Sequence, residues 1–159
     1  SYFLWSSMPD EELFSLAESG RLQRQEVLDA QARRMLRDPK ARALVESFGG
    51  QWLTLRNLRA AAPDPQRFPT FNEELREAML KETELFLEHV IRQDRSLMEL
   101  FTADYTFLNE PLARHYGIEG VKGPEFRRVP LTDGRRGGIL KQASILTVTS
   151  NPSRTNRIR

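Results

Sequence analysis

Apolar residues recur along the chain at helical spacing, and capping residues, glycines and prolines divide the pattern into segments. A first helix is predicted over residues 9–18, with Ser6 or Ser7 as its cap and Gly20 just beyond its end. A second helix is predicted over residues 24–37. Its inner face is expected to carry Leu28, Ala32, Met35 and Leu36.

Residues 40–56 have the clearest helical period in the sequence. Their apolar positions fall within a narrow arc when about 100° is allowed per residue. The arc consists of Ala41, Leu44, Val45, Phe48, Trp52 and Leu55. Gly49 and Gly50 interrupt it, and each glycine costs a helix about 1 kcal/mol relative to alanine. A close approach of another helix, or a kink, is therefore expected at these glycines.

The longest predicted helix covers residues 72–93 and has two apolar lines. One line consists of Leu75, Ala78, Met79, Leu85, Phe86 and Val90, and the other of Leu80, Leu87 and Ile91. A helix that is apolar along two lines has neighbours on two sides. We therefore expect this helix to lie at the centre of the fold.

The remaining segments are shorter. The pattern predicts an extended connection over 60–69, helical turns at 96–101 and 110–116 on either side of 103–108, a strand within 125–131, and a last helix over 136–148. Asp133-Gly134 is a hairpin-turn signal. The predicted fold class is all-α: an irregular bundle of about six or seven helices with long loops, and a short β-hairpin signalled near 125–136.

The composition is that of a globular segment, with 159 residues, 39% apolar and 29% charged. No apolar run approaches the roughly 20 residues needed to span a bilayer, and the first residues do not have the pattern of a signal peptide. With no cysteine, the segment can form no disulfide, zinc-thiolate site, thiol nucleophile or covalent haem attachment. Because neither end has a clear start or stop, both are expected to be cuts through a longer polypeptide.

Charge is distributed unevenly along the chain. Residues 120–159 hold nine basic and two acidic side chains, a formal charge of +7, so that the net +2 leaves −5 for residues 1–119. A basic segment of this kind can bind an anionic partner. It can equally pack against an acidic part of the same parent protein.

Two polar residues interrupt the apolar stripe of the long helix. Glu82 and His89 lie two turns apart on the same side, about 10 Å from each other, which is too far for a direct hydrogen bond. They are candidates for a general acid and base or for two metal ligands. The alternative is that each is held in the core by an arginine or a backbone group.

No metal is predicted, because the Glu-x-x-His signature of di-iron helical bundles is absent. Phe86 and Leu112 stand three residues before His89 and His115. The common hydrolase, nucleotide-binding and zinc-protease motifs are also absent, so no catalytic residue is assigned.

The basic end of the chain offers a candidate anion site. Arg135 and Arg136 precede two glycines at a predicted helix start, where amide donors and guanidinium groups converge. Asn151 and Arg154 belong to a polar segment, 147–155, that forms either a turn or the wall of a cleft. The full set of candidate polar or anion-binding residues is Glu82, His89, His115, Arg135, Arg136, Asn151 and Arg154.

Several longer strings resemble a known family. They are SYFLWSSMPDEEL at 1–13, FTADYTFLN at 101–109, LARHYG at 112–117, RGGIL at 136–140 and TVTSNP at 147–152. Together they resemble planctomycete-specific domain four as it runs into the planctomycete cytochrome-c-like domain three. Arg157 stands where that family has a proline, so residues 157–159 depart from the pattern.

The resemblance implies that residues 1–134 form a helical module and that residues 135–159 begin the next one. It also implies a large exported bacterial parent, periplasmic or at the cell surface, in which such modules are fused to a haem-binding cytochrome-c segment. The haem motif of the family lies elsewhere in the parent, so this segment is expected to hold no cofactor.

Three functional hypotheses follow. The first is a non-catalytic interaction or scaffold module whose partners are other domains of the same parent chain. The second is part of an enzyme whose site is completed by further C-terminal segments. The third is anion or nucleic-acid binding through the last 40 residues, and nucleic acid is disfavoured because charge alone supports it.

Overall fold

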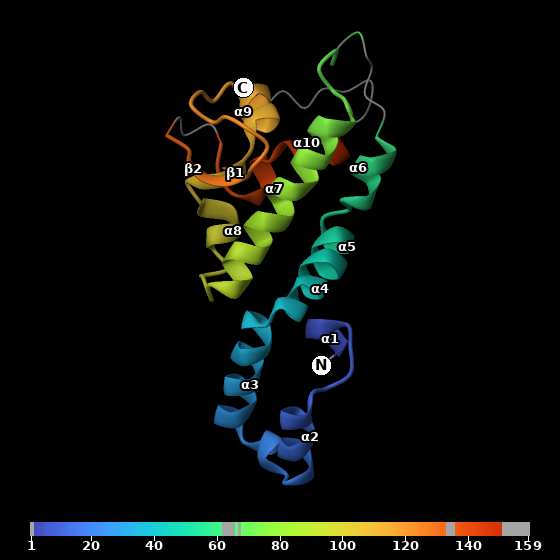
Figure 1. Ribbon diagram of the computed structural model, residues 1–159, viewed down its shortest axis with the longest axis vertical. Helices are drawn as coiled ribbons and strands as arrows, with labels where there is room; N and C mark the ends of the chain where they lie inside the picture. The colour runs from blue at the N-terminus through green and yellow to red at the C-terminus, as the bar shows by residue number, and fades with distance from the viewer. Residues whose placement is uncertain (1, 62–65, 67, 133–135, 151–159) are drawn as a thin grey trace.

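The computed structural model describes residues 2–61, 66, 68–132 and 136–150. The secondary-structure elements are α1 (Tyr2–Trp5), α2 (Glu11–Glu18), η1 (Arg21–Gln23), α3 (Gln25–Arg37), η2 (Pro39–Ala41), α4 (Arg42–Leu44), η3 (Val45–Gly49), α5 (Gly50–Trp52), α6 (Arg56–Ala60), α7 (Glu73–Arg92), α8 (Glu99–Thr102), β1 (Tyr105–Leu108), α9 (Glu110–Tyr116), β2 (Arg127–Pro130), η4 (Ile139–Lys141) and α10 (Ala143–Thr149). The described chain is mostly helical with a small antiparallel sheet (Figure 1), which confirms the predicted fold class.

Helix α7 lies at the centre of the larger part of the fold, between the β1–β2 sheet on one side and α6 on the other (Figure 1). It begins at Glu73 and is capped by Asn72, whose side-chain oxygen accepts a hydrogen bond from the Leu75 N–H at 2.8 Å. The predicted length and the central position are confirmed. Its buried apolar side chains are Leu75, Ala78, Met79, Leu80, Phe86, Leu87 and Val90.

The N-terminal helices form a smaller part with a core of its own, at the end of the molecule away from α9 (Figure 1). That core consists of Trp5, Leu13, Met35 and Ala41. The Trp5 indole N–H donates to the Met35 carbonyl at 2.8 Å, which fixes α1 against α3. Asp10 caps α2 and also binds Arg34, so the predicted Ser6 or Ser7 cap is wrong. Leu28 is 48% exposed and does not lie on the inner face as predicted.

The predicted helix over residues 40–56 is divided into η2, α4, the π-helical segment η3 and α5. A Cβ atom on Gly49 would lie 2.6 Å from Leu87 Cδ1, so the glycine is the point where this segment meets α7. Trp52 is half-exposed, contrary to the predicted arc, because the wide π turn changes the direction of later side chains. The side chain of Phe48 lies outside the described set.

The strand predicted within 125–131 exists as β2, and its partner is β1. The pairing is antiparallel, with Tyr105 opposite Pro130 and Leu108 opposite Arg127. The partner therefore comes from the segment 103–108, with α9 inside the connection. Asp133 and Gly134, the predicted turn, lie outside the described residues.

The C-terminal segment packs into the same core as α7. Its predicted helix over 136–148 begins only at Ala143, after the 3₁₀ turn η4, and Ile139, Ala143 and Ile145 join the main core. The predicted inward Leu146 is only half-buried. The module boundary at residues 134 and 135 stays a prediction. Within the described residues, no helix is long and apolar enough to cross a membrane.

Candidate functional site

A fully buried carboxyl group lies in the middle of α7. Glu82 has no exposed surface, and its two oxygens accept hydrogen bonds from Thr106 Oγ1 at 2.5 Å and from Tyr116 Oη at 2.6 Å. The Tyr116 oxygen in turn accepts the Ala143 N–H at 2.8 Å. Glu82 therefore connects α7 with β1 and α9 directly and with α10 through Tyr116.

Burial sets the protonation state of this carboxyl. Loss of hydration raises the pKa of Glu82 to about 7, although hydrogen bonds from Thr106 and Tyr116 and the charge of Arg136 favour the ionised form. Burial and the neighbouring carboxylate raise the pKa of Tyr116 well above its ordinary value. Glu82 can hold a proton near neutral pH, but its complete burial separates it from any substrate in solution.

The raised pKa predicts a characteristic pH dependence of stability. Glu82 binds its proton up to about pH 7 in the folded state and loses it near pH 4.5 when unfolded, so unfolding releases a proton between these values. The contribution of Glu82 to the free energy of unfolding is greatest below pH 4.5. It should fall by about 3 kcal/mol as pH rises to 7 and stay constant above it.

The measurement is urea unfolding of the wild type and of Glu82→Gln at pH values from 4.5 to 8. Glutamine does not titrate, so the difference between the two unfolding free energies should follow the slope described above. Asp10 and Glu99 have lowered pKa values, through hydrogen bonds from Arg34 and Arg95 respectively, and their contributions are lost only at lower pH. Parallel profiles for the two proteins would contradict the proposed protonation of Glu82.

A second polar cluster lies next to Glu82, also in the core. Thr83 Oγ1 donates to the Gln142 side-chain oxygen at 2.7 Å and lies 2.6 Å from Ser144 Oγ, so it joins α7 to the start of α10. Gln142 Nε2 has no hydrogen-bond partner within the described residues. Because both clusters join α7 to surrounding elements, their first effect is to fix how those elements pack.

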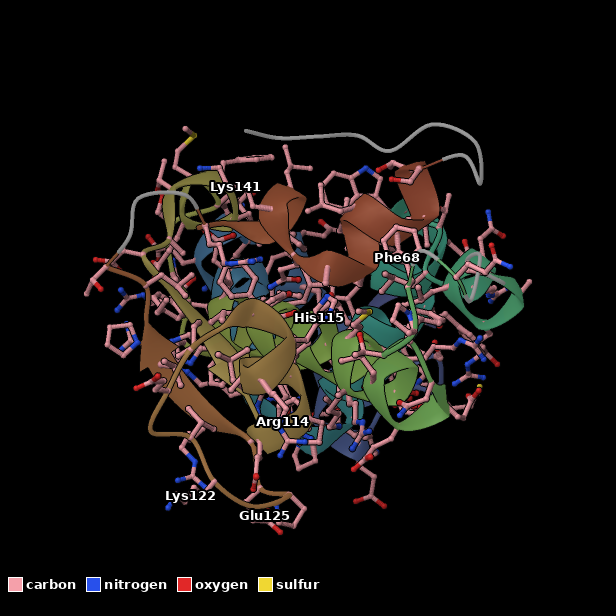
Figure 2. All side chains as sticks on the ribbon, turned by 90° about the horizontal axis from the view of Figure 1, so that it is seen from above. Phe68, Arg114, His115, Lys122, Glu125 and Lys141 are labelled. Atoms are coloured by element: carbon pink, nitrogen blue, oxygen red, sulfur yellow. The ribbon has the colours of Figure 1, made fainter. Side chains whose placement is uncertain are left out.

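Three of the predicted candidate residues lie around Tyr116. Glu82 accepts a hydrogen bond from the Tyr116 hydroxyl. The Arg136 guanidinium lies 4.2 Å from the centre of the Tyr116 ring, and the centre of the His115 ring lies 5.8 Å from it. Figure 2 shows His115 on α9. Partial desolvation lowers the pKa of His115, and Arg136 lowers it further.

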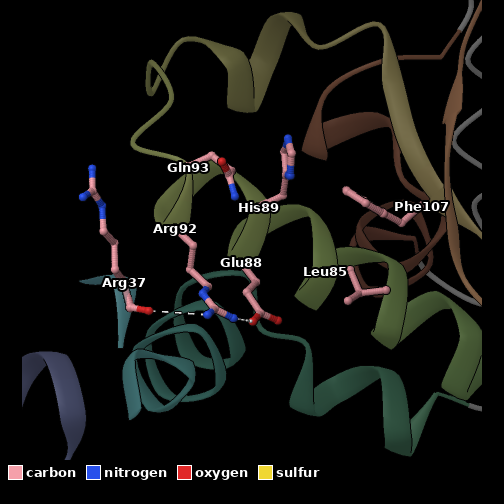
Figure 3. A pocket seen from close by; sticks show the side chains of 7 residues that line it. All are labelled: Arg37, Leu85, Glu88, His89, Arg92, Gln93 and Phe107. Atoms are coloured by element: carbon pink, nitrogen blue, oxygen red, sulfur yellow. Dashed lines mark hydrogen bonds and ion pairs between the residues drawn. The ribbon is translucent and has the colours of Figure 1, made fainter. Parts of the chain in front are cut away.

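His89 lies in a different place from Glu82. Its ring contacts Tyr105 edge-on, with centroids 5.5 Å apart, and Phe107 at the same separation. It lines an open pocket of about 560 Å³ together with Arg37, Leu85, Glu88, Arg92, Gln93 and Phe107 (Figure 3). Glu82 and His115 do not line this pocket, so the described residues do not bring Glu82, His89 and His115 into one site.

The other candidate residues fall outside the described part of the chain. These are Arg135, Asn151 and Arg154. The anion site at 135–138 and the cleft formed by 147–155 therefore stay predictions. Within the described residues, no group of three or more histidine, aspartate or glutamate side chains is placed to hold a metal ion.

Sequence reasoning found Glu82 but missed Thr106 and Tyr116 as its partners. They lie 24 and 34 residues further along the chain. The available signal was a hydroxyl group in each of two short segments, YTFL for Thr106 and LARHY for Tyr116. That signal marks a buried polar group but does not identify its partner.

The fold and its interior define a mostly α-helical module whose buried polar groups are bonded mainly to one another. The family model PSD4, a protein of unknown function (DUF1592), matches residues 1–118, which is well over half of the chain. The chain belongs to this family, as the resemblance in the sequence indicated. Neither a curated protein nor a solved structure matches it.

Proposed function

We propose that this chain is a non-catalytic helical interaction or scaffold module of a larger exported bacterial protein associated with cytochrome c. Its partners are other domains of the same parent chain, in the periplasm or at the cell surface. One observation supports this most: large apolar side chains lie exposed on α8, on the two residues before it and on η4, and α8 and η4 contact each other. This α8–η4 face consists of Leu97 (71% exposed), Met98 (63%), Phe101 (47%) and Leu140 (53%).

The α8–η4 face is held in place by the core beneath it. Leu100 and Ile139 point inward from α8 and η4 and are buried. The Gly138 N–H donates to the Ala103 carbonyl at 3.0 Å, which ties the start of η4 to the end of α8. Figure 2 shows Lys141, the last residue of η4, beside α8. Clustered apolar side chains on a surface mark an interaction site more often than single ones do.

The enzyme alternative has less support within the described residues. It requires an acid or base that a substrate can reach, and the most perturbed carboxyl, Glu82, is completely buried. His115 does not line the pocket that His89 lines. The remaining enzyme candidates, Asn151 and Arg154, lie outside the described residues.

The anion-binding alternative is also less well supported. Arg128 lies 3.9 Å from the Tyr105 ring centre, and Arg136 lies 4.2 Å from that of Tyr116. Two cations of the basic C-terminal region therefore pack on aromatic rings of this chain. Their charges are still present, but their side chains are already engaged within the module.

The proposal is tested by methionine oxidation in the isolated chain and in the full parent protein. Met98 and Met8 are similarly exposed, at 63% and 61%, whereas Met35 and Met79 are buried. In the isolated chain, peroxide should oxidise Met98 and Met8 at comparable rates. In the parent, another domain should cover the α8–η4 face, and Met98 should oxidise at least about tenfold more slowly while Met8 keeps its rate. Peptide mass spectrometry measures both rates.

A surface variant provides the matched control. Leu97→Lys with Phe101→Lys in the parent should restore rapid oxidation of Met98, because charges on the α8–η4 face oppose burial of that face. Equal Met98 rates in the isolated chain and the parent would contradict the proposed docking. Deleting the module from the parent should leave haem absorbance and redox turnover unchanged, whereas a loss of turnover would support the enzyme alternative.

A further inference from the structure

We infer that the open pocket lined by His89 is a binding site for a small organic anion, a carboxylate attached to an apolar ring or chain. The pocket lies where the end of α3 meets the last turns of α7. The inference goes beyond the proposed scaffold role, and the pocket shares no residue with the α8–η4 face. Either proposal can therefore fail without the other.

The pocket has a charged end and an apolar end. Figure 3 shows Arg37 at one end, the paired side chains of Arg92 and Glu88 in the middle, and Leu85 and Phe107 at the other end. Its volume of about 560 Å³ suits a small molecule rather than a peptide or a single ion. A ligand that complements this arrangement is itself amphiphilic, with one polar and one apolar end.

The polar side chains that remain available are mainly donors. Arg92 is engaged with Glu88 at 2.8 Å and also donates to the Arg37 carbonyl at 3.4 Å. The Arg37 guanidinium and the Gln93 amide have no hydrogen-bond partner among the described residues. Arg37 offers the forked donor geometry that binds a carboxylate through both oxygens. Glu88 neutralises Arg92, so the charge left in the lining is that of Arg37.

The electrostatic field around His89 also favours an anion. Burial lowers the pKa of His89, and the positive charges of Arg128 on β2 and of Arg95 lower it further, while Glu99 acts in the opposite direction. Glu99 itself forms an ion pair with Arg95 at 2.8 Å and accepts a hydrogen bond from the Tyr105 hydroxyl at 2.6 Å. The imidazole is therefore neutral at pH 7 and can donate one ring N–H to a bound carboxylate.

The ends of α3 and α7 oppose an anion, because the carbonyl end of a helix is partly negative. At exposed sites this effect is weaker than that of a hydrogen bond between charged groups. Arg37 can form two such bonds with one carboxylate. The Arg37 side chain is exposed, so binding is expected to be weak.

The two histidines of the chain allow a direct test by NMR. Benzoate is titrated at pH 7 while the ring Cε1–Hε1 signals of His89 and His115 are followed. We expect saturable shifts of the His89 signal, and a raised His89 pKa when benzoate is bound, because a carboxylate stabilises the imidazolium. His115 does not line the pocket and serves as the internal control. Shifts of equal size at both histidines, or shifts that never saturate, would overturn the inference.

Two variants and one analogue identify the binding groups. Arg37→Gln should weaken benzoate binding at least fivefold, and its thermal midpoint should stay unchanged because the Arg37 side chain is exposed. Arg59→Gln removes an exposed arginine from α6 and should bind like the wild type. Benzyl alcohol keeps the ring but removes the charge, and should bind at least fivefold more weakly than benzoate. Equal affinity of the two compounds, or of Arg37→Gln and the wild type, would show that no carboxylate site exists.

Discussion

Replacing Glu82 by alanine is expected to lower the free energy of unfolding by about 3–5 kcal/mol. The substitution leaves a cavity in the core beside α7, and it removes the hydrogen-bond partner of the Thr106 and Tyr116 hydroxyls. Buried hydroxyl groups without a partner cost about 1–3 kcal/mol each, and the surrounding helices can collapse only partly around the cavity. Urea unfolding at pH 6, where most of the folded protein carries a protonated Glu82, measures the loss directly.

Glu77→Ala is the matched control for this experiment. Glu77 is on the same helix, has the same side chain and is exposed. Its replacement should change the free energy of unfolding by less than about 0.5 kcal/mol, as is usual for surface positions. If the two variants were equally stable, the hydrogen bonds of Glu82 would contribute nothing to packing. The view of α7 as the element that organises the other helices would then fail.

The long-range partners of Glu82 show what the sequence could predict and what it could not. Periodicity placed α7 and showed that Glu82 lies on its apolar stripe, because both depend only on residues close in sequence. The identity of its partners depends on how β1 and α9 return to α7. That return is set by packing over 24 and 34 residues of chain, and no local spacing records it.

Trp52 illustrates a different kind of failure. Its position on the inner arc followed from an ideal helix with a constant angle per residue. The structure has a π-helical segment at η3, where Gly49 meets Leu87 of α7. The glycines did signal a close approach, but periodicity cannot show that the helix widens there and turns Trp52 toward solvent. The local irregularity has a tertiary cause.

The sequence also predicted the candidate site only in part: it placed the polar residues on the helix but not their neighbours. Glu82 and His89 face the same side of one helix in the sequence pattern, which made a shared site plausible. In the structure, Glu82 meets hydroxyl groups from β1 and α9, while His89 meets the rings of Tyr105 and Phe107 and the open pocket. Two helical turns separate them, and different residues of β1 contact each one: Thr106 contacts Glu82, whereas Tyr105 and Phe107 contact His89. Helical phase alone therefore gives two polar positions but not one site.

Gly138→Ala is expected to destabilise the fold by at least about 3 kcal/mol, through a clash that no side-chain movement can relieve. Gly138 has a φ of 63°, and a Cβ atom there would lie 2.6 Å from the Phe101 carbonyl carbon and 2.9 Å from the Leu100 oxygen, and would overlap the Phe101 oxygen. All three are backbone atoms, so the change must displace η4 from α8 and disturb the α8–η4 face.

Gly120→Ala separates this clash from the cost of the backbone conformation. Gly120 has a φ of 86°, and no atom lies within 4 Å of the position its Cβ would take. Alanine there should cost only about 1–2 kcal/mol, the usual penalty of the left-handed conformation. Urea unfolding of both variants gives the difference. Equal losses would mean that the contact between Gly138 and α8 does not hold η4 in place. The close approach of η4 to α8, on which the α8–η4 face depends, would then lose its structural basis.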